Sequence, residues 1–129
     1  MLVELEDTLS FKVLGCAIEV HKELGPGLLE SIYEEALAME LEDNGFYVQR
    51  QQPVPVMYKG RTLKNDLRYD LLVNGRLLVE LKSVENLLPV HSKQTLSYLK
   101  LMHLREGLLI NFNVNVLKEG VRRILNDKK

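Results

Sequence analysis

The stretch "DLRYDLLVNGRLLVELKSV", residues 66–84, predicts a β-hairpin with charged residues at unusual positions in its strands. Apolar runs lie on both sides of Asn74-Gly75, a pair typical of hairpin turns. A two-residue loop there would place the side chains of Asp70 and Glu80 on opposite faces of the sheet. A three-residue loop, with a type I turn and Gly75 in the left-handed region as a bulge, would place them on one face.

The three-residue loop is favoured because it divides the hairpin into an apolar face and a charged face. The apolar face would carry Leu71, Val73, Leu77, Val79 and Leu81. The other face would carry Asp70, Leu72, Leu78, Glu80 and Lys82. Because burial of a wholly apolar face specifies strand register, we predict that the core also brings the two acids and the lysine together.

Charged side chains on a strand most often mean only that this face is exposed to solvent. Here Leu72 and Leu78 share the charged face, so neighbouring helices are expected to cover part of it. Two carboxylates on a partly covered face repel each other unless a cation lies between them. Oxygen ligands suit Mg²⁺ or Mn²⁺, and Lys82 could stabilise an anion or help to orient an attacking water.

The rest of the chain predicts helices around this sheet. The expected elements are helices at 8–24, 29–43 and 90–104, extended chain at 46–63 with a turn at 59–60, a buried strand at 107–112, and a closing strand or helical turn at 119–125. This order indicates a mixed α/β domain whose sheet has helices packed against it.

Composition limits the class of protein. The 129 residues, of which 46% are hydrophobic and 27% charged, suit one domain spanning residues 1–129. No apolar run approaches the length of a membrane span. The single cysteine, Cys16, cannot form an internal disulfide, and we therefore predict a cytoplasmic protein with no membrane partner.

The charge pattern restricts how nucleic acid would be bound. A net charge of −1 means that binding would depend on local basic patches or on a bound metal cation. Basic residues gather at positions 50, 59, 61, 64 and 68, and again at Arg122, Arg123, Lys128 and Lys129. Such groups can contact phosphates, although most surface charge is simply solvated.

Asp70, followed after nine residues by Glu80-Leu81-Lys82, resembles the D…(E/D)xK signature of the PD-(D/E)XK nuclease superfamily. The strings "GLLESIY" (27–33), "LPVHSKQTLSYLKL" (88–101) and "GLLINF" (107–112) extend the likeness over nearly the whole chain. Together they resemble the GxxExxY protein family. The resemblance implies a single-domain, restriction-endonuclease-like (PD-(D/E)XK) α/β fold, with a mixed central β-sheet flanked by helices.

The resemblance also implies a role for each residue of the signature. Asp70, Glu80 and the carbonyl of Leu81 would hold Mg²⁺ or Mn²⁺, and Lys82 would lie beside the attacking water or the scissile phosphate. The proline that precedes the aspartate in the signature is absent, and Tyr69 stands in its place.

Three residues outside the hairpin complete the implied site. Glu30 would supply a further acid near the metal, although an acid is favoured at a helix N-terminus in any case. Gln94 and Tyr98 match a Q-x-x-x-Y element, which implies a catalytic role for Gln94 and substrate contact for Tyr98. Their spacing places them on one face of the third helix, which would also suit an ordinary solvent-facing stripe.

The leading interpretation is a divalent-metal-dependent nuclease that hydrolyses phosphodiester bonds, with DNA the more expected substrate than RNA. The alternative is a non-catalytic nuclease-fold module that binds nucleic acid or a partner protein. The small size and near-neutral charge favour the alternative, whereas the intact Asp70, Glu80 and Lys82 favour the enzyme. The sequence leaves the oligomeric state open, with a homodimer as one option.

Overall fold

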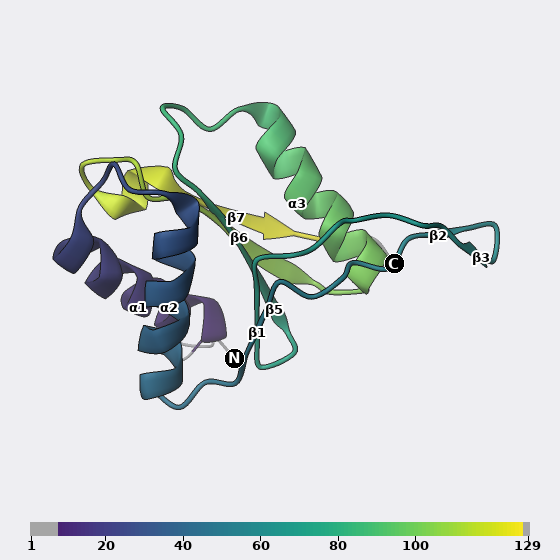
Figure 1. Ribbon diagram of the computed structural model, residues 1–129, viewed down its shortest axis with the longest axis horizontal. Coiled ribbons are helices and arrows are strands. Elements are labelled where there is room, and N and C mark those ends of the chain that lie inside the picture. The colour runs from purple at the N-terminus through teal and green to yellow at the C-terminus, as the bar shows by residue number, and fades with distance from the viewer. Residues whose placement is uncertain (1–7, 128–129) are drawn as a thin grey trace.

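The structure, a computed structural model that describes residues 8–127, places a five-stranded sheet among three helices (Figure 1). Its elements are α1 (Leu9–Leu24), α2 (Glu30–Asp43), β1 (Val48–Arg50), β2 (Met57–Tyr58), β3 (Arg61–Thr62), β4 (Leu71–Val73), β5 (Leu77–Lys82), α3 (Pro89–Met102), β6 (Glu106–Asn111), the 3₁₀ helix η2 (Leu117–Gly120) and β7 (Val121–Leu125). The predicted mixed α/β class is confirmed, and the closing segment is a 3₁₀ turn followed by a strand. Lys128 and Lys129 of the second basic group lie outside the described residues.

The sheet has the strand order β1-β4-β5-β6-β7. Strands β5 and β6 are parallel and the other neighbouring pairs are antiparallel. A parallel pair needs a crossover connection, and α3 supplies it between β5 and β6. Figure 1 shows α1 and α2 on one side of the sheet and α3 on the other. The central strand β5 is therefore covered on both faces.

The hairpin between β4 and β5 has the predicted register. Val73 pairs with Leu77, and the ladder continues to the pair of Leu71 with Val79. Three residues, 74–76, therefore form the loop, as the apolar pattern required. The five residues of the apolar face are buried in the larger core, together with residues of α1 and α2.

The turn itself differs from the expected type I geometry. Asn74 (φ 54°) and Gly75 (φ 66°) both have positive φ, and the Arg76 N–H donates to the Val73 carbonyl at 3.0 Å. Positive φ at both central positions marks the mirror-image type I′ turn, whose twist matches that of the strands. Asparagine tolerates this conformation, and Asn74 Oδ1 here accepts the Tyr47 N–H at 2.9 Å.

The second face of the hairpin is covered by α3. Leu78 is fully buried in a smaller core with Tyr69, Tyr98 and Leu99, and Leu72 packs against it. These leucines lie on the face that carries Asp70, Glu80 and Lys82, because residues two apart in a strand share a face. The acids and the lysine are thus at the margin of a covered face.

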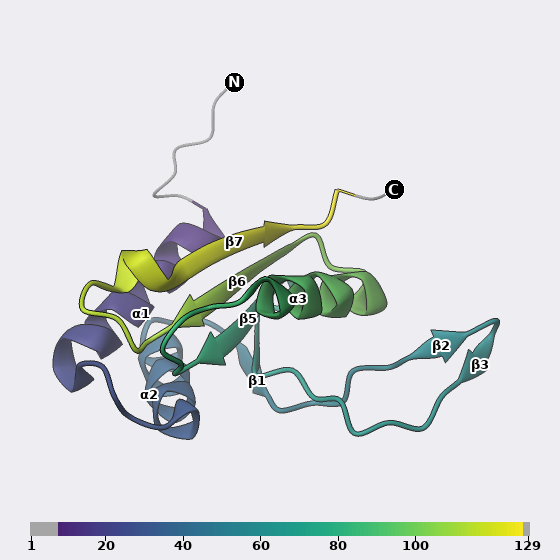
Figure 2. The ribbon, with the colours of Figure 1, turned by 90° about the horizontal axis from the view of Figure 1, so that it is seen from above.

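Between β1 and β4 the chain leaves the sheet as a two-stranded arm, residues 52–68. Figure 2 shows β2 and β3 at its far end, extended away from the helices. The arm turns at Lys59 and Gly60, which both have positive φ, as predicted for this dipeptide. No helix within residues 8–127 is long and apolar enough to cross a membrane.

Candidate active site

The Asp70 and Glu80 side chains each accept a backbone N–H across the hairpin, just before β4 begins. Glu80 Oε2 accepts the backbone N–H of Asp70 at 2.8 Å, and Asp70 Oδ2 accepts the backbone N–H of Leu81 at 2.8 Å. Asp70 would be opposite Glu80 if the ladder ran one pair further than Leu71 and Val79. The two carboxylates therefore satisfy backbone N–H donors just beyond the ladder. The register of the hairpin places both side chains on one face of the sheet.

The acidic pair, Asp70 and Glu80, is electrostatically strained. Glu80 is only 6% exposed, and burial, followed by the charge of Asp70, raises its pKa to about 8. Burial also raises the pKa of Asp70, against the lowering effect of the hydrogen bond from Leu81. A buried pair of like charges favours either a shared proton or a bound cation.

Lys82 lies beside this pair. It follows Glu80 by two residues in β5 and is half-buried, and its charge lowers the pKa of both carboxyl groups. Neither of the two ion pairs in residues 8–127 includes it. Its ammonium group is therefore free to meet an external anion near the acidic pair.

A third acid, Glu34, reaches the acidic pair through an amide. Glu34 is 8% exposed on α2, and Gln51 Nε2 donates to Glu34 Oε1 at 2.6 Å and to Asp70 Oδ1 at 3.1 Å. Arg50 Nε pairs with Glu34 Oε2 at 3.2 Å. The charge of Glu34 contributes to the raised pKa of both carboxyl groups of the acidic pair. Glu34 and Gln51 thus belong to the same network as the predicted acids.

The Leu81 carbonyl is directed toward this network. The Leu81 N–H donates to Asp70, whereas the next carbonyl along, that of Lys82, accepts the Phe112 N–H at 2.9 Å on the other side of the strand. The N–H and C=O groups of one residue in a strand point to the same side, and successive residues alternate. The Leu81 carbonyl therefore points to the side where Asp70 lies.

Glu30 occupies a different position from Glu34. It is the exposed first residue of α2, and no hydrogen bond or ion pair in residues 8–127 joins it to the acidic pair. Glu34 lies one turn further along α2 and is the helical acid that the structure brings to the network. Sequence reasoning missed it, although residues four apart share a helix face and could have drawn attention to it.

The two residues predicted on α3 are joined to each other by a hydrogen bond. Gln94 is exposed, and its Nε2 lies 3.4 Å from the hydroxyl of Tyr98. Tyr98 is buried in the smaller core with Tyr69, the neighbour of Asp70 in sequence. No hydrogen bond among residues 8–127 joins either of them to the acidic pair. They form part of the wall on the same face of the sheet.

The Gly27–Tyr33 string has a structural role at the start of α2. Gly27 has φ 96°, a conformation that favours glycine. The Tyr33 hydroxyl accepts the Leu28 N–H at 3.1 Å and donates to the Gly25 carbonyl. Ser83 Oγ donates to the Leu28 carbonyl at 2.6 Å. This loop therefore joins α2 to the end of β5, directly after Lys82.

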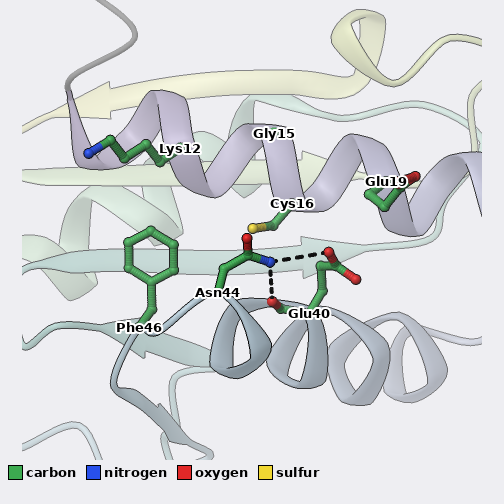
Figure 3. A pocket seen from close by; sticks show the side chains of 7 residues that line it. All are labelled: Lys12, Gly15, Cys16, Glu19, Glu40, Asn44 and Phe46. Carbon is green, nitrogen blue, oxygen red and sulfur yellow. Dashed lines mark hydrogen bonds between the residues drawn. The ribbon is translucent and has the colours of Figure 1, made fainter.

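A pocket between α1 and α2 offers no comparable chemistry (Figure 3). Its lining residues are Lys12, Gly15, Cys16, Glu19, Glu40, Asn44 and Phe46. Burial and then the charge of Glu40 raise the pKa of the Cys16 thiol, which disfavours the nucleophilic thiolate. The acidic pair, on the opposite face of the sheet, is therefore the better candidate for a catalytic site.

The acidic pair fits a hard divalent cation in the chemistry of its donors. Within residues 8–127 no group of three or more His, Cys, Asp or Glu residues is arranged to hold a metal ion. Mg²⁺, however, is commonly bound through one or two carboxylates and retains several waters. The hydrogen bond to Glu80 uses its Oε2, and its Oε1 accepts none from the described residues. Among these residues the one fully buried side-chain polar atom without a partner is Asn126 Oδ1, so Glu80 Oε1 keeps some contact with solvent. It is thus available to a cation.

A family model described as the PD-(D/E)XK nuclease superfamily matches residues 7–124, a segment that includes the whole of the network around Asp70. No curated protein and no solved structure matches the chain.

Proposed function

The chain belongs to the PD-(D/E)XK nuclease superfamily, and on that premise we propose that it is a divalent-metal-dependent nuclease that hydrolyses phosphodiester bonds. The predicted superfamily and its mixed-sheet fold are confirmed, while the narrower GxxExxY family stays a prediction. The observation that carries the proposal is that Glu80 accepts the Asp70 N–H while Asp70 accepts the Leu81 N–H. These bonds hold a buried and a half-buried carboxylate beside Lys82, which makes no ion pair in the described residues.

Asp70 and Glu80, with the Leu81 carbonyl, are the proposed ligands of Mg²⁺ or Mn²⁺. Nucleases of this superfamily typically use divalent metal ions, and such an ion, when bound, activates water and neutralises charge on the phosphate. The chain contributes orientation. Asp70 is held by the Leu81 N–H on one oxygen and by Gln51 on the other, so its carboxylate needs little reorganisation to accept a cation.

Lys82 is proposed to stabilise the negative charge that develops on the phosphate. Its side chain makes no ion pair in the described residues, and it lies on the face of the acidic pair. A positive charge fixed at that position acts in a partly desolvated site, where it is worth more than in water. Gln94 and Tyr98 are proposed to assist from α3, with Tyr98 at the margin of the substrate.

We assign the helix-borne acid of the site to Glu34 rather than to Glu30. Glu34 is buried and shares Gln51 with Asp70, whereas Glu30 is exposed at the start of α2, where an acid is favoured by the helix dipole. Glu34 would act by orienting Gln51 and Asp70, because the Gln51 amide lies between its carboxylate and that of Asp70.

DNA remains the proposed substrate ahead of RNA, and a homodimer remains one option for the assembly. The second candidate function is a non-catalytic module that binds nucleic acid or a partner protein. One observation favours it, namely that no group of three or more His, Cys, Asp or Glu residues in the described part of the chain is arranged to hold a metal ion. Cleavage and metal binding distinguish the two candidates.

The test is a cleavage screen on DNA and RNA substrates with Mg²⁺ or Mn²⁺, alongside calorimetric titration of Mn²⁺. The parent should bind Mn²⁺ and cleave, and Glu80→Gln should lose both properties because it removes a ligand charge. Glu85→Gln is the matched control, since Glu85 is exposed shortly after β5. A parent that binds no divalent ion would exclude the nuclease and leave the binding module.

A further inference from the structure

The arm, residues 52–68, differs in charge from the rest of the chain. Its basic residues are Lys59, Arg61, Lys64 and Arg68, and its one acid is Asp66, in a chain whose net charge is −1. All four basic residues are exposed, and neither ion pair in residues 8–127 includes any of them. Lys59 Nζ lies 5.4 Å from the centre of the Tyr58 ring. The arm therefore presents four positive charges against one negative charge, and none of the four is in an ion pair within the described residues.

The shape of the arm suits an extended partner. Its two chains run antiparallel, with the Val54 N–H bound to the Leu67 carbonyl at 2.9 Å near the base and β2 paired with β3 at the tip. Residues 52–59 span at most about 26 Å at about 3.3 Å per residue. A two-stranded ribbon of this kind fits the major groove of duplex DNA. Val54 at the base packs in the smaller core with Tyr98 and Leu99 of α3, and Figure 2 shows that the far end, β2 and β3, extends away from the helices.

The base of the arm is attached to the acidic pair. The Gln51 N–H donates to the Asp70 carbonyl at 3.0 Å, and the Tyr69 N–H donates to the Gln52 carbonyl at 3.2 Å. Arg68 Nη1 donates to the Gln51 carbonyl at 3.0 Å. Because Gln51 also holds the Asp70 carboxylate, the direction of the arm is set by the same residues that orient the proposed metal ligand.

We propose that the arm binds the phosphate backbone of a nucleic acid duplex, and that it positions the duplex so that a phosphate reaches the acidic pair. The inference rests on the proposed function for the identity of the partner. Lys59, Arg61 and Lys64 make the phosphate contacts distant from the site, and Arg68 makes those near it. At 3.4 Å per base pair, the tip contacts phosphates up to about eight base pairs from the scissile one.

The composition of the arm favours a duplex over a single strand or a protein. Binding to single strands relies on several aromatic side chains that stack on bases, whereas Tyr58 is the one exposed aromatic residue of the arm. Its exposed apolar residues, which include Met57 and Leu63, are interspersed with the basic ones and form no charge-depleted centre of the kind that protein interfaces have. Contacts led by charge are typical of backbone recognition.

The test is fluorescence anisotropy with a labelled DNA duplex of about 24 base pairs, roughly two helical turns, in EDTA so that no cleavage occurs. The variant Lys59→Gln/Arg61→Gln/Lys64→Gln should bind roughly 100-fold more weakly at about 0.1 M salt, because three phosphate contacts are lost. The slope of log K against log salt should become shallower by about 2.7. Circular dichroism checks that the variant is folded.

The matched control is Lys12→Gln/Lys22→Gln/Lys118→Gln, which removes the same charge from exposed positions on α1 and η2. It should bind the duplex within about threefold of the parent. On a duplex of about six base pairs, which is too short for the arm to reach while the site is occupied, the arm variant and the parent should also agree within about threefold. Equal weakening of the arm variant and the control, or tighter binding of a single strand than of the duplex, overturns the inference.

The two proposals fail in different ways. Arm-dependent duplex binding by a parent that cleaves nothing with Mn²⁺ supports the arm and removes the nuclease. Metal-dependent cleavage by a parent whose duplex affinity does not depend on the arm supports the nuclease and removes the arm. An affinity and a salt slope measured in EDTA decide whether the arm binds the duplex, so the test of the arm does not depend on activity.

Discussion

Gln51 and Asp70 are joined by a hydrogen bond of 3.1 Å between amide and carboxylate, which fixes the acid from the edge strand as well as from β5. The same amide nitrogen donates to Glu34 at 2.6 Å. Gln51 has φ 51° at the end of β1, and a positive φ is uncommon for residues other than glycine. A strained backbone at this position indicates that the placement of the amide matters to the site.

Gln51→Ala should therefore weaken Mn²⁺ binding several-fold while leaving the fold intact. The variant frees Asp70 to rotate and leaves the buried Glu34 with one partner fewer, a change of about 1–2 kcal/mol in the free energy of unfolding. Calorimetric titration and urea unfolding measure both effects. Gln52→Ala is the control, because the Gln52 side chain donates only to the Arg50 carbonyl. Equal Mn²⁺ affinity in the two variants would show that the bridge does not orient Asp70.

Lys82→Ala should separate metal binding from turnover. Removal of a positive charge beside the acidic pair leaves Mn²⁺ affinity unchanged or slightly tighter, because the lysine opposes the cation. Turnover should be slower because the activation barrier rises by about 2–4 kcal/mol, the usual contribution of a charge-stabilising group. Single-turnover cleavage measures this loss. Lys100→Ala, at an exposed position on α3, should cleave like the parent, and a fully active Lys82→Ala would assign the activity to another site.

Tyr33→Phe should destabilise the protein without touching the acids. The hydroxyl bonds the loop between α1 and α2 at two points, and the ring stacks on Phe112 at 4.4 Å between centres. Phenylalanine keeps the stacking and loses both hydrogen bonds, at a cost of about 1–3 kcal/mol because the Leu28 N–H then lacks its partner. Thermal unfolding measures the change, with Tyr58→Phe on the exposed arm expected to be neutral. A Tyr33→Phe variant as stable as the parent would mean that water replaces the hydroxyl.

The register of the hairpin could be predicted because it depends on a local pattern. The alternation from Leu71 to Leu81 admits one register that buries a uniform face, and that register alone brings Asp70 opposite Glu80. The helices were predictable within two residues at each end for the same reason, since their apolar periodicity and their glycine and proline stops are local signals.

The outer part of the site depends on contacts that no local pattern encodes. Glu30 and Glu34 lie on one face of α2 in sequence, and only the position of the edge strand β1 brings Glu34 to Gln51. The left-handed conformation of Gln51 gives no signal in the residues around it. The basic residues of 52–68 could be read from the sequence. That they lie on an arm whose base is next to Asp70 depends on pairing between distant residues, which the sequence does not show.

The raised pKa of Glu80 makes stability and metal binding depend on pH in opposite directions. Its ordinary value is 4.5, and burial together with Asp70 raises the pKa to about 8 in the folded protein. Between pH 4.5 and about 8, Glu80 therefore keeps its proton in the folded state and has lost it in the unfolded state. In EDTA the free energy of unfolding should fall as pH rises through this window, by up to about 1.4 kcal/mol per pH unit from this group.

The variant Glu80→Gln removes this titration, and its amide oxygen can still accept the Asp70 N–H. The free energy of unfolding of the variant should therefore depend less on pH, and the variant should be more stable than the parent above about pH 8. Mn²⁺ must displace the proton, so the affinity of the parent should rise as pH increases toward about 8, with proton release on binding. Urea unfolding in EDTA and titrations in buffers of different ionisation enthalpy measure the two effects. Parallel pH profiles for the parent and Glu80→Gln would show that Glu80 is already ionised at neutral pH.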